Sequence, residues 1–228
     1  MKKPIIIVNF KAYQSGSGAR GLELAKLHEK IAKQTGVNFA IAVQSVDLRM
    51  IASAVSIPVF AQHFDPVEFG TFTGHILPHG LKDGGAVGTL LNHAERKLSL
   101  DLIEKAVELA RSLGLFTVLC ADTAYAGKAL SELDPDLIAV EPPELIGGDI
   151  SVVSANPQII SDVVAMIGKE KVLVGAGVKS RHDVKRALEL GAVGVLVASG
   201  VMKSMNPEEV LLDLAQGVLD HKPLARNI

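Results

Sequence analysis

Short apolar runs rich in β-branched residues alternate along the chain with longer segments in which apolar residues recur at helical spacing. The short runs are continuously apolar, which is typical of strands covered on both faces of a sheet. Eight of them are predicted as strands: Pro4 to Phe10, Val37 to Val43, Ile57 to Ala61, Ala86 to Leu91, Leu115 to Ala121, Leu137 to Val140, Val172 to Val174 and Val193 to Ala198.

The segments between these runs predict helices, several with recognisable ends. Ser99, Ser180 and Asn206 stand where a side-chain oxygen caps a helix, and Gly114 and Gly191 stand where one ends. Helices are expected at Gly16 to Gly36, Asp47 to Ala54, Ser99 to Leu113, a segment ending at Leu133, Pro157 to Ile167, Ser180 to Leu190 and Pro207 to Leu219, with a short one near His79 to Lys82.

Strands that alternate with helices pair in parallel. About eight such units without a linker predict an α/β fold with one (β/α)8 TIM barrel domain over residues 1–228, although about 250 residues are typical of that barrel. An open doubly wound sheet is the alternative, and it usually carries a glycine-rich fingerprint after the first strand. Asn9, Phe10 and Lys11 occupy that place instead.

Composition narrows the class of protein. The chain has 228 residues, 48% of them hydrophobic, and a net charge of -2, so nothing favours nucleic-acid binding. Its single cysteine, Cys120, follows a strand-like run and is interpreted as a buried, inert thiol of a reducing compartment. No segment approaches the roughly 20 apolar residues of a membrane span, so we expect a soluble cytoplasmic protein that does not bind membranes.

One carboxylate stands where the strand Leu137 to Val140 ends. Glu141 is followed by two prolines and then by the pair Gly147-Gly148. Proline holds the preceding residue in extended conformations, and glycine lets the chain bend. This arrangement suits a catalytic base beneath a lid, and that is one interpretation of Glu141. The alternative interpretation is a surface glutamate in an ordinary loop.

Polar residues and glycines also follow the other strands, and in a barrel these positions share one rim. Taken singly, Lys11 could be a solvated surface lysine and His93 a structural histidine. Gly175 and Gly177 could form a plain turn or let backbone N–H groups approach a phosphate. The residues at these strand ends are Asn9, Lys11, Gln44, Gln62, His63, Asn92, His93, Glu95, Gly175, Gly177, Ala198, Ser199 and Gly200.

The remaining histidines carry less information. His28, His182 and His221 lie in polar or helical contexts and are predicted at the surface. The spacing of those near the third strand (His63, His75 and His79) matches no closed metal motif, so no metal is predicted.

The chain resembles the triosephosphate isomerase family over nearly its full length. The resemblance is carried by three segments in this order: Asn9-Phe-Lys11, Asn92-His93-Ala-Glu95-Arg96 and Glu141-Pro142. The short length and the turn from Val197 to Gly200 are similar to the archaeal branch. The resemblance implies interconversion of dihydroxyacetone phosphate and glyceraldehyde 3-phosphate, in glycolysis and gluconeogenesis, with no cofactor.

In that family a glutamate acts as general base and a neutral histidine as electrophile. The resemblance therefore implies that Glu141 moves a proton between two adjacent carbons and that His93 polarises the carbonyl. Asn9 and Lys11 would orient the substrate, with Glu95 as a supporting acid. A helix starting at Ala94 to Lys97 would keep the imidazole neutral through its N-terminal dipole.

The phosphate of the substrate would be held by backbone groups at Ile146, Gly177, Ala198 and Ser199, again by resemblance. The family is generally oligomeric, so a homotetramer is expected, with a dimer as the alternative. Two features depart from the family pattern: Glu144 stands where a tryptophan is usual, and the lid tip reads Gly147-Gly148-Asp149. Both lid acids are expected to face outward.

Two rival functions remain open at this point. Other phosphate-binding barrels, such as pentose-phosphate epimerases or phosphoribosyl isomerases, use paired aspartates or metal ligands at strand ends, where this chain has only Asp122. A barrel kept as a binding or scaffold protein is expected to lose the set formed by Lys11, His93 and Glu141, and this chain keeps all three.

Overall fold

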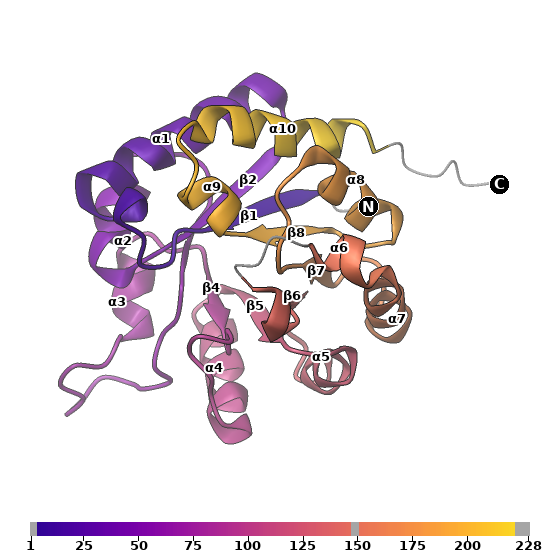
Figure 1. The fold of residues 1–228 in the computed structure, drawn as a ribbon. Coiled ribbons are helices and arrows are strands. Elements are labelled where there is room, and N and C mark those ends of the chain that lie inside the picture. Colours follow the sequence, from indigo (N-terminus) through magenta and orange to yellow (C-terminus); the bar gives the residue numbers. More distant parts are fainter. Residues whose placement is uncertain (1–3, 147–150, 222–228) are drawn as a thin grey trace.

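The computed structural model describes residues 4–146 and 151–221. Eight parallel strands form a closed barrel in sequence order, and β8 pairs back onto β1 (Figure 1). This confirms the predicted barrel and excludes the open sheet. The strands are β1 (Ile5–Asn9), β2 (Asn38–Val43), β3 (Val59–Ala61), β4 (Gly88–Leu91), β5 (Phe116–Ala121), β6 (Leu137–Val140), β7 (Val172–Val174) and β8 (Gly194–Val197).

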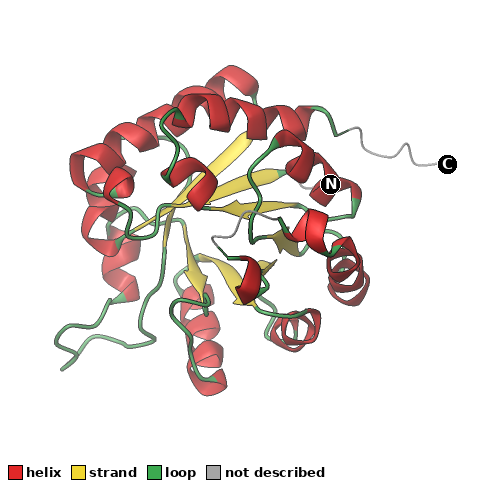
Figure 2. Cartoon of the chain, in the orientation of Figure 1, coloured by secondary structure: helices red, strands yellow, loops and turns green. Residues whose placement is uncertain are grey.

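Helices surround the barrel as an outer layer (Figure 2). None of those in the described ranges is both long and apolar enough to cross a membrane. They are η1 (Gln14–Gly16), α1 (Gly18–Thr35), α2 (Ser45–Ala52), α3 (Pro78–Asp83), α4 (Leu100–Ser112), α5 (Ala124–Ser131), η2 (Pro143–Leu145), α6 (Val152–Ala155), α7 (Pro157–Ile167), α8 (Arg181–Glu189), α9 (Ser199–Met202) and α10 (Pro207–Leu219).

Two of the three predicted N-caps act as caps, and the helix predicted at Asp47 to Ala54 lies two residues earlier, at Ser45–Ala52. The Ser180 side chain forms a reciprocal capping box with Asp183, and Asn206 accepts a hydrogen bond from the Glu209 N–H group. Ser99 has the extended conformation of a cap residue but makes no capping hydrogen bond. A hydrogen bond from the Ser99 hydroxyl lowers the pKa of the Asp101 carboxyl instead, because donation to a carboxylate stabilises its charged form.

Alternation along the strands divides the buried apolar residues into two groups. One group fills the interior of the barrel, and the other fills the layer between the barrel and the helices. In β1, for example, Ile7 points inward while Ile6 and Val8 face the helices. This double burial explains why the strands are continuously apolar in sequence.

His28 is completely buried, so its predicted surface position is wrong. It lies on α1 between the rings of Phe10 and Phe39, with ring centroids 5.4 Å and 6.1 Å away. Its Nδ1 lies 2.7 Å from the carbonyl oxygen of Leu24, while Nε2 is buried without a hydrogen-bond partner in the described chain. Burial lowers the pKa of His28 from 6.5 to about 4.

This histidine should make the fold sensitive to acid. Above pH 6.5 it is neutral in both the folded and unfolded states. As the pH falls from 6.5 to about 4, only the unfolded chain takes up the proton, so the free energy of unfolding should fall by roughly 3 kcal/mol. Urea unfolding across this range measures the effect.

His28→Leu should flatten the pH dependence in that window. The exposed His182 gives the matched control, and His182→Leu should keep the wild-type profile. A His28→Leu protein with the wild-type slope between pH 4 and 6.5 would contradict the assignment.

Candidate active site

Strand alternation carries polar side chains into the open mouth of the barrel. On β6, Leu137 and Ala139 belong to the barrel interior, and Glu141 follows on the same face. On β1, Asn9 follows the interior residue Ile7 in the same way. The carboxyl ends of the parallel strands therefore deliver these groups to one site.

A cavity at this mouth brings together eight of the nine site residues predicted from sequence. The ninth, Glu95, does not line the cavity but contacts Lys11 beside it. The lining residues are Asn9, Lys11, Tyr13, His93, Glu141, Ile146, Ala176, Gly177, Val178, Leu196, Val197, Ala198 and Ser199.

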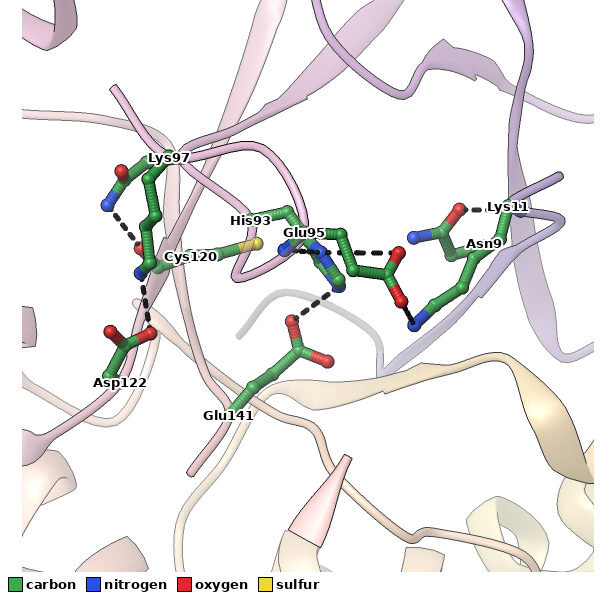
Figure 3. A network of polar contacts seen from close by, with 9 residues as sticks. Asn9, Lys11, His93, Glu95, Lys97, Cys120, Asp122 and Glu141 are labelled. Carbon is green, nitrogen blue, oxygen red and sulfur yellow. Dashed lines mark hydrogen bonds and ion pairs between the residues drawn. The ribbon is translucent and has the colours of Figure 1, made fainter. Parts of the chain in front are cut away.

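Glu141 is buried, with 7% of its surface exposed, which rules out the surface-glutamate reading. Burial raises the pKa of its carboxyl to about 7, against the opposing effects of Lys11 and of a hydrogen bond from Cys120. Oε2 has no hydrogen-bond partner among the described residues and lies 3.5 Å from His93 Nε2 (Figure 3). A buried carboxylate with a free oxygen and a pKa near neutrality can act as a general base.

Cys120 lies in the barrel interior and donates a hydrogen bond to the Glu141 carboxyl. It is the buried free thiol that the sequence predicted, and its pKa is raised well above the ordinary value by burial and then by Glu141. The thiol therefore stays protonated and acts as a hydrogen-bond donor.

Gly175 at the end of β7 provides the space that the Glu141 side chain occupies. A Cβ atom at this position would lie 2.4 Å from Glu141 Cγ and 2.6 Å from Oε1. The sequence interpretation offered Gly175 only as a turn or a phosphate contact and missed this role. No spacing signal marks it, because the contact joins two strand ends 34 positions apart in the chain.

Gly175→Ala should therefore displace the Glu141 carboxylate. A misplacement of about 1 Å can cost on the order of 100-fold in rate, so we expect a loss of that order in kcat with the fold retained. The matched control is Gly80→Ala, because a Cβ atom there meets nothing within 4 Å. Steady-state kinetics and circular dichroism test this, and wild-type kcat in Gly175→Ala would contradict it.

His93 is held in one tautomer by the turn that follows it. The Glu95 N–H group donates to His93 Nδ1 at 3.1 Å, so the ring proton resides on Nε2, which faces Glu141. Burial and then the charge of Lys11 lower the pKa of His93. The imidazole is therefore neutral near pH 7 and presents a donor to the cavity.

The helix predicted from Ala94 to Lys97 does not form, and this segment is a turn. Asn92 has a left-handed conformation with φ 57°, and its Oδ1 accepts a hydrogen bond from the Leu98 N–H group. That closure holds residues 92–98 in a loop, so α4 begins only at Leu100. Burial and Lys11 thus lower the pKa of the imidazole where a helix dipole was expected to do so, and the Glu95 N–H group fixes its tautomer.

Lys11 is mostly buried, so the reading as a solvated lysine is wrong. Its side chain is 14% exposed, and Nζ lies 2.7 Å from Glu95 Oε1. The backbone adopts φ 46° and is held by Asn9 Oδ1, which accepts from the Lys11 N–H group, and by Gln62, which donates to the Lys11 carbonyl. These contacts direct a positive charge toward the cavity beside Asn9 (Figure 3).

The opposite part of the cavity is lined mainly by backbone and apolar groups. Ala176 and Gly177 both have φ 72°, a left-handed pair that turns the chain after β7. Ser199 begins the four-residue α9 after β8. Glu144, beside this region, is exposed as expected, whereas the predicted lid tip Gly147-Gly148-Asp149 lies outside the described residues.

The other histidines serve local contacts. His63 Nε2 lies 3.2 Å from Asp65 Oδ1, and the rings of His75 and His79 pack against Phe72 and Phe69. Over residues 4–146 and 151–221, no group of three or more His, Cys, Asp or Glu side chains has an arrangement that could hold a metal ion.

Comparison with known proteins agrees with this geometry. A sequence profile of the family described as Triosephosphate isomerase matches residues 4–217. The triosephosphate isomerase of Methanocaldococcus jannaschii is 48% identical over 214 residues, which cover 92% of this chain and 98% of that protein. That of Saccharolobus solfataricus is 43% identical, covering 96% of this chain and 98% of the relative. The chain belongs to the triosephosphate isomerase family.

Proposed function

We propose that the chain interconverts dihydroxyacetone phosphate and D-glyceraldehyde 3-phosphate by proton transfer through an enediolate. One observation carries this: a buried carboxylate with a raised pKa faces a neutral imidazole N–H across 3.5 Å, inside one cavity that also contains Lys11 and Asn9. The family membership supports the reaction, and the geometry supports the chemical role that we propose for each residue.

Proton transfer begins at Glu141. Its free Oε2 accepts the proton from the carbon next to the carbonyl, and the carbonyl oxygen takes up the negative charge that develops. The hydroxyl proton on the first carbon then passes to the oxyanion, and the protonated Glu141 returns a proton to the neighbouring carbon. The carbonyl group and the hydroxyl group thereby exchange places without net oxidation. A pKa near 7 suits this group to both accepting and releasing the proton.

The developing oxyanion is stabilised by His93 and Lys11. A neutral imidazole donates from Nε2 without carrying an acidic proton that would leave the ring too early, and Lys11 supplies positive charge. Glu95 positions the Lys11 ammonium through their 2.7 Å contact. Asn9 shapes the Lys11 backbone by accepting its N–H.

The phosphate is assigned to the backbone at Ile146, Gly177, Ala198 and Ser199. These positions line the cavity of Glu141 and His93, and the left-handed turn at Gly177 supports close approach of an anion to the main chain. Holding the phosphate there would place the reacting carbons toward the carboxylate.

A coupled assay tests the reaction. Purified protein, without added cofactor or metal and with a chelator present, should convert glyceraldehyde 3-phosphate, and a downstream dehydrogenase should report the product. Glu141→Gln prepared in parallel controls for contaminating enzyme. Wild-type protein that shows no turnover above this control would overturn the proposal.

We also propose a homo-oligomer, a tetramer by resemblance with a dimer as the alternative. The loop between β3 and α3 projects from the barrel and exposes Phe69 and Phe72, at 72% and 42% of their surface (Figure 1). Such side chains favour burial against another copy. Native mass spectrometry distinguishes the states, and a monomer at micromolar concentration would contradict both.

The cellular setting follows from the proposed reaction. We assign the protein to the cytoplasm and to glycolysis and gluconeogenesis. We also propose that residues 1–228 form one catalytic domain. A single buried cysteine and a barrel closed by its first and last strands support the assignment. Cell fractionation that places the chain outside the cytoplasm would contradict it.

A further inference from the structure

A buried carboxylate outside the catalytic cavity joins two segments that flank that cavity. Asp183 lies at the start of α8 with 7% of its surface exposed. Its Oδ1 accepts a hydrogen bond from the Ser151 hydroxyl at 2.6 Å. The two residues are 32 positions apart, so this contact is a feature of the tertiary structure.

The other oxygen of Asp183 holds the loop that follows β7. Oδ2 accepts hydrogen bonds from the backbone N–H groups of Lys179 and Ser180, both at 3.1 Å, and from the Ser180 hydroxyl at 2.9 Å. A helix capping box needs only the bond to the Ser180 N–H group. The bonds to Lys179 and Ser151 therefore go beyond capping of α8.

A second bond joins the same two segments closer to the cavity. The Val152 N–H group donates to the carbonyl oxygen of Ala176 at 3.1 Å. Ala176 and Gly177, which line the cavity, both have the left-handed φ of 72°, a conformation that costs a non-glycine residue on the order of 1 kcal/mol. External contacts are needed to keep Ala176 in that conformation.

Ser151 itself is buried, and its hydroxyl acts both as a hydrogen-bond acceptor and as a donor. Its Oγ accepts from the Ser154 N–H group at 3.2 Å, which caps α6, while its own proton goes to Asp183. The base of α6 and residues 176–180 are thus tied together at two points, Ser151 to Asp183 and Val152 to Ala176.

We propose that Asp183 is a positioning residue that acts through Ser151 and the 176–180 turn to hold the Gly177 backbone in place for the substrate phosphate. This inference rests on the proposed function. The phosphate site lies away from the proton-transfer pair Glu141 and His93, so we expect loosening it to raise KM more than it lowers kcat.

Ser151→Ala tests the link with the smallest change. Loss of one buried hydrogen bond should raise KM for glyceraldehyde 3-phosphate roughly fivefold. The inhibition constant of inorganic phosphate should rise by the same factor, with kcat within about twofold of wild type. Ser151→Thr keeps the hydroxyl and should restore both constants. The matched control is Ser112→Ala, an exposed serine at the end of α4, which should keep the wild-type KM.

A double-mutant cycle separates positioning from helix capping. The cap that Ser151 makes on α6 does not involve Asp183, so a capping effect would persist in an Asp183→Ala background. On our inference, Asp183→Ala alone raises KM at least as much as Ser151→Ala, and adding Ser151→Ala then changes KM less than twofold. If Asp183→Ala does not fold, the Ser151→Ala and Ser151→Thr pair still decides.

The outcomes distinguish this inference from the proposed function. Active wild-type protein with an unchanged KM in Ser151→Ala overturns the inference alone, as does an undiminished Ser151→Ala effect in the Asp183→Ala background. Wild-type protein without turnover overturns the proposed function instead.

Discussion

Glu141→Ala is expected to lower kcat on the order of 10²–10⁴-fold, with a much smaller change in KM. The side chain removed is the buried carboxylate whose Oε2 faces His93 and has no other partner in the described chain. Its proposed role exists only while the proton is in transfer, so its loss affects the transition state more than substrate binding. Steady-state kinetics with glyceraldehyde 3-phosphate measure both constants.

The matched control for Glu141→Ala is Glu144→Ala. Glu144 is three positions further along the chain, carries the same charge and is exposed, so its removal should leave kcat within about twofold of wild type. An unchanged kcat in Glu141→Ala would remove Glu141 from the mechanism.

The pH dependence of the free enzyme offers an independent view of the same carboxylate. Burial raises the pKa of Glu141 to about 7, so the base becomes protonated as the pH falls below 7 and kcat/KM should fall about tenfold per pH unit. The substrate phosphate also titrates near pH 6 and could contribute to the same fall in kcat/KM. A titration of the carbon-13-labelled Glu141 carboxyl in the free enzyme should therefore be compared with the kinetic pH profile. A titration midpoint near the ordinary glutamate value of 4.5 would contradict the assignment.

His93→Asn is expected to lower kcat about 10²–10³-fold. This is the range observed when one hydrogen-bond donor to an oxyanion is lost. The fixed Nε2–H is lost, and the shorter amide does not reach the same point in the cavity. His182→Asn is the control at an exposed position and should leave kcat unchanged.

Nitrogen-15 spectra test the protonation state on which this role depends. The bond from the Glu95 N–H group to Nδ1 requires a neutral ring protonated at Nε2, and burial favours the neutral form. The expected spectrum at pH 7 is that of the neutral Nε2–H tautomer. An imidazolium signal at pH 7 would contradict the proposed electrophile.

Regular elements with a strong local pattern were predicted well. The helices Pro157–Ile167 and Pro207–Leu219 and the strands Leu137–Val140 and Val172–Val174 have the expected bounds. Their periodicity follows from the backbone geometry of one segment, so neighbours in sequence are sufficient to predict them.

Helical elements of four residues or fewer were missed. The helices α6 and α9 and the 3-10 turn η2 are too short for apolar periodicity to mark them, and they form through contacts such as the Ser151 cap. The opposite error occurred at Ala94 to Lys97, where good helix formers are held in a turn by Asn92.

The local sequence predicted the order of strands and helices and the barrel, and it placed Asn9, His93 and Glu141 at strand ends. It could do so because the periods of strands and helices depend on neighbouring residues. Contacts across the barrel decided the rest: the burial of His28, the Gly175 space for Glu141, and the ties of Lys11 to Glu95 and Ser151 to Asp183, across 84 and 32 positions. The burial and the pKa of a side chain depend on which groups from distant parts of the chain pack around it. Only the closed barrel brings those groups together.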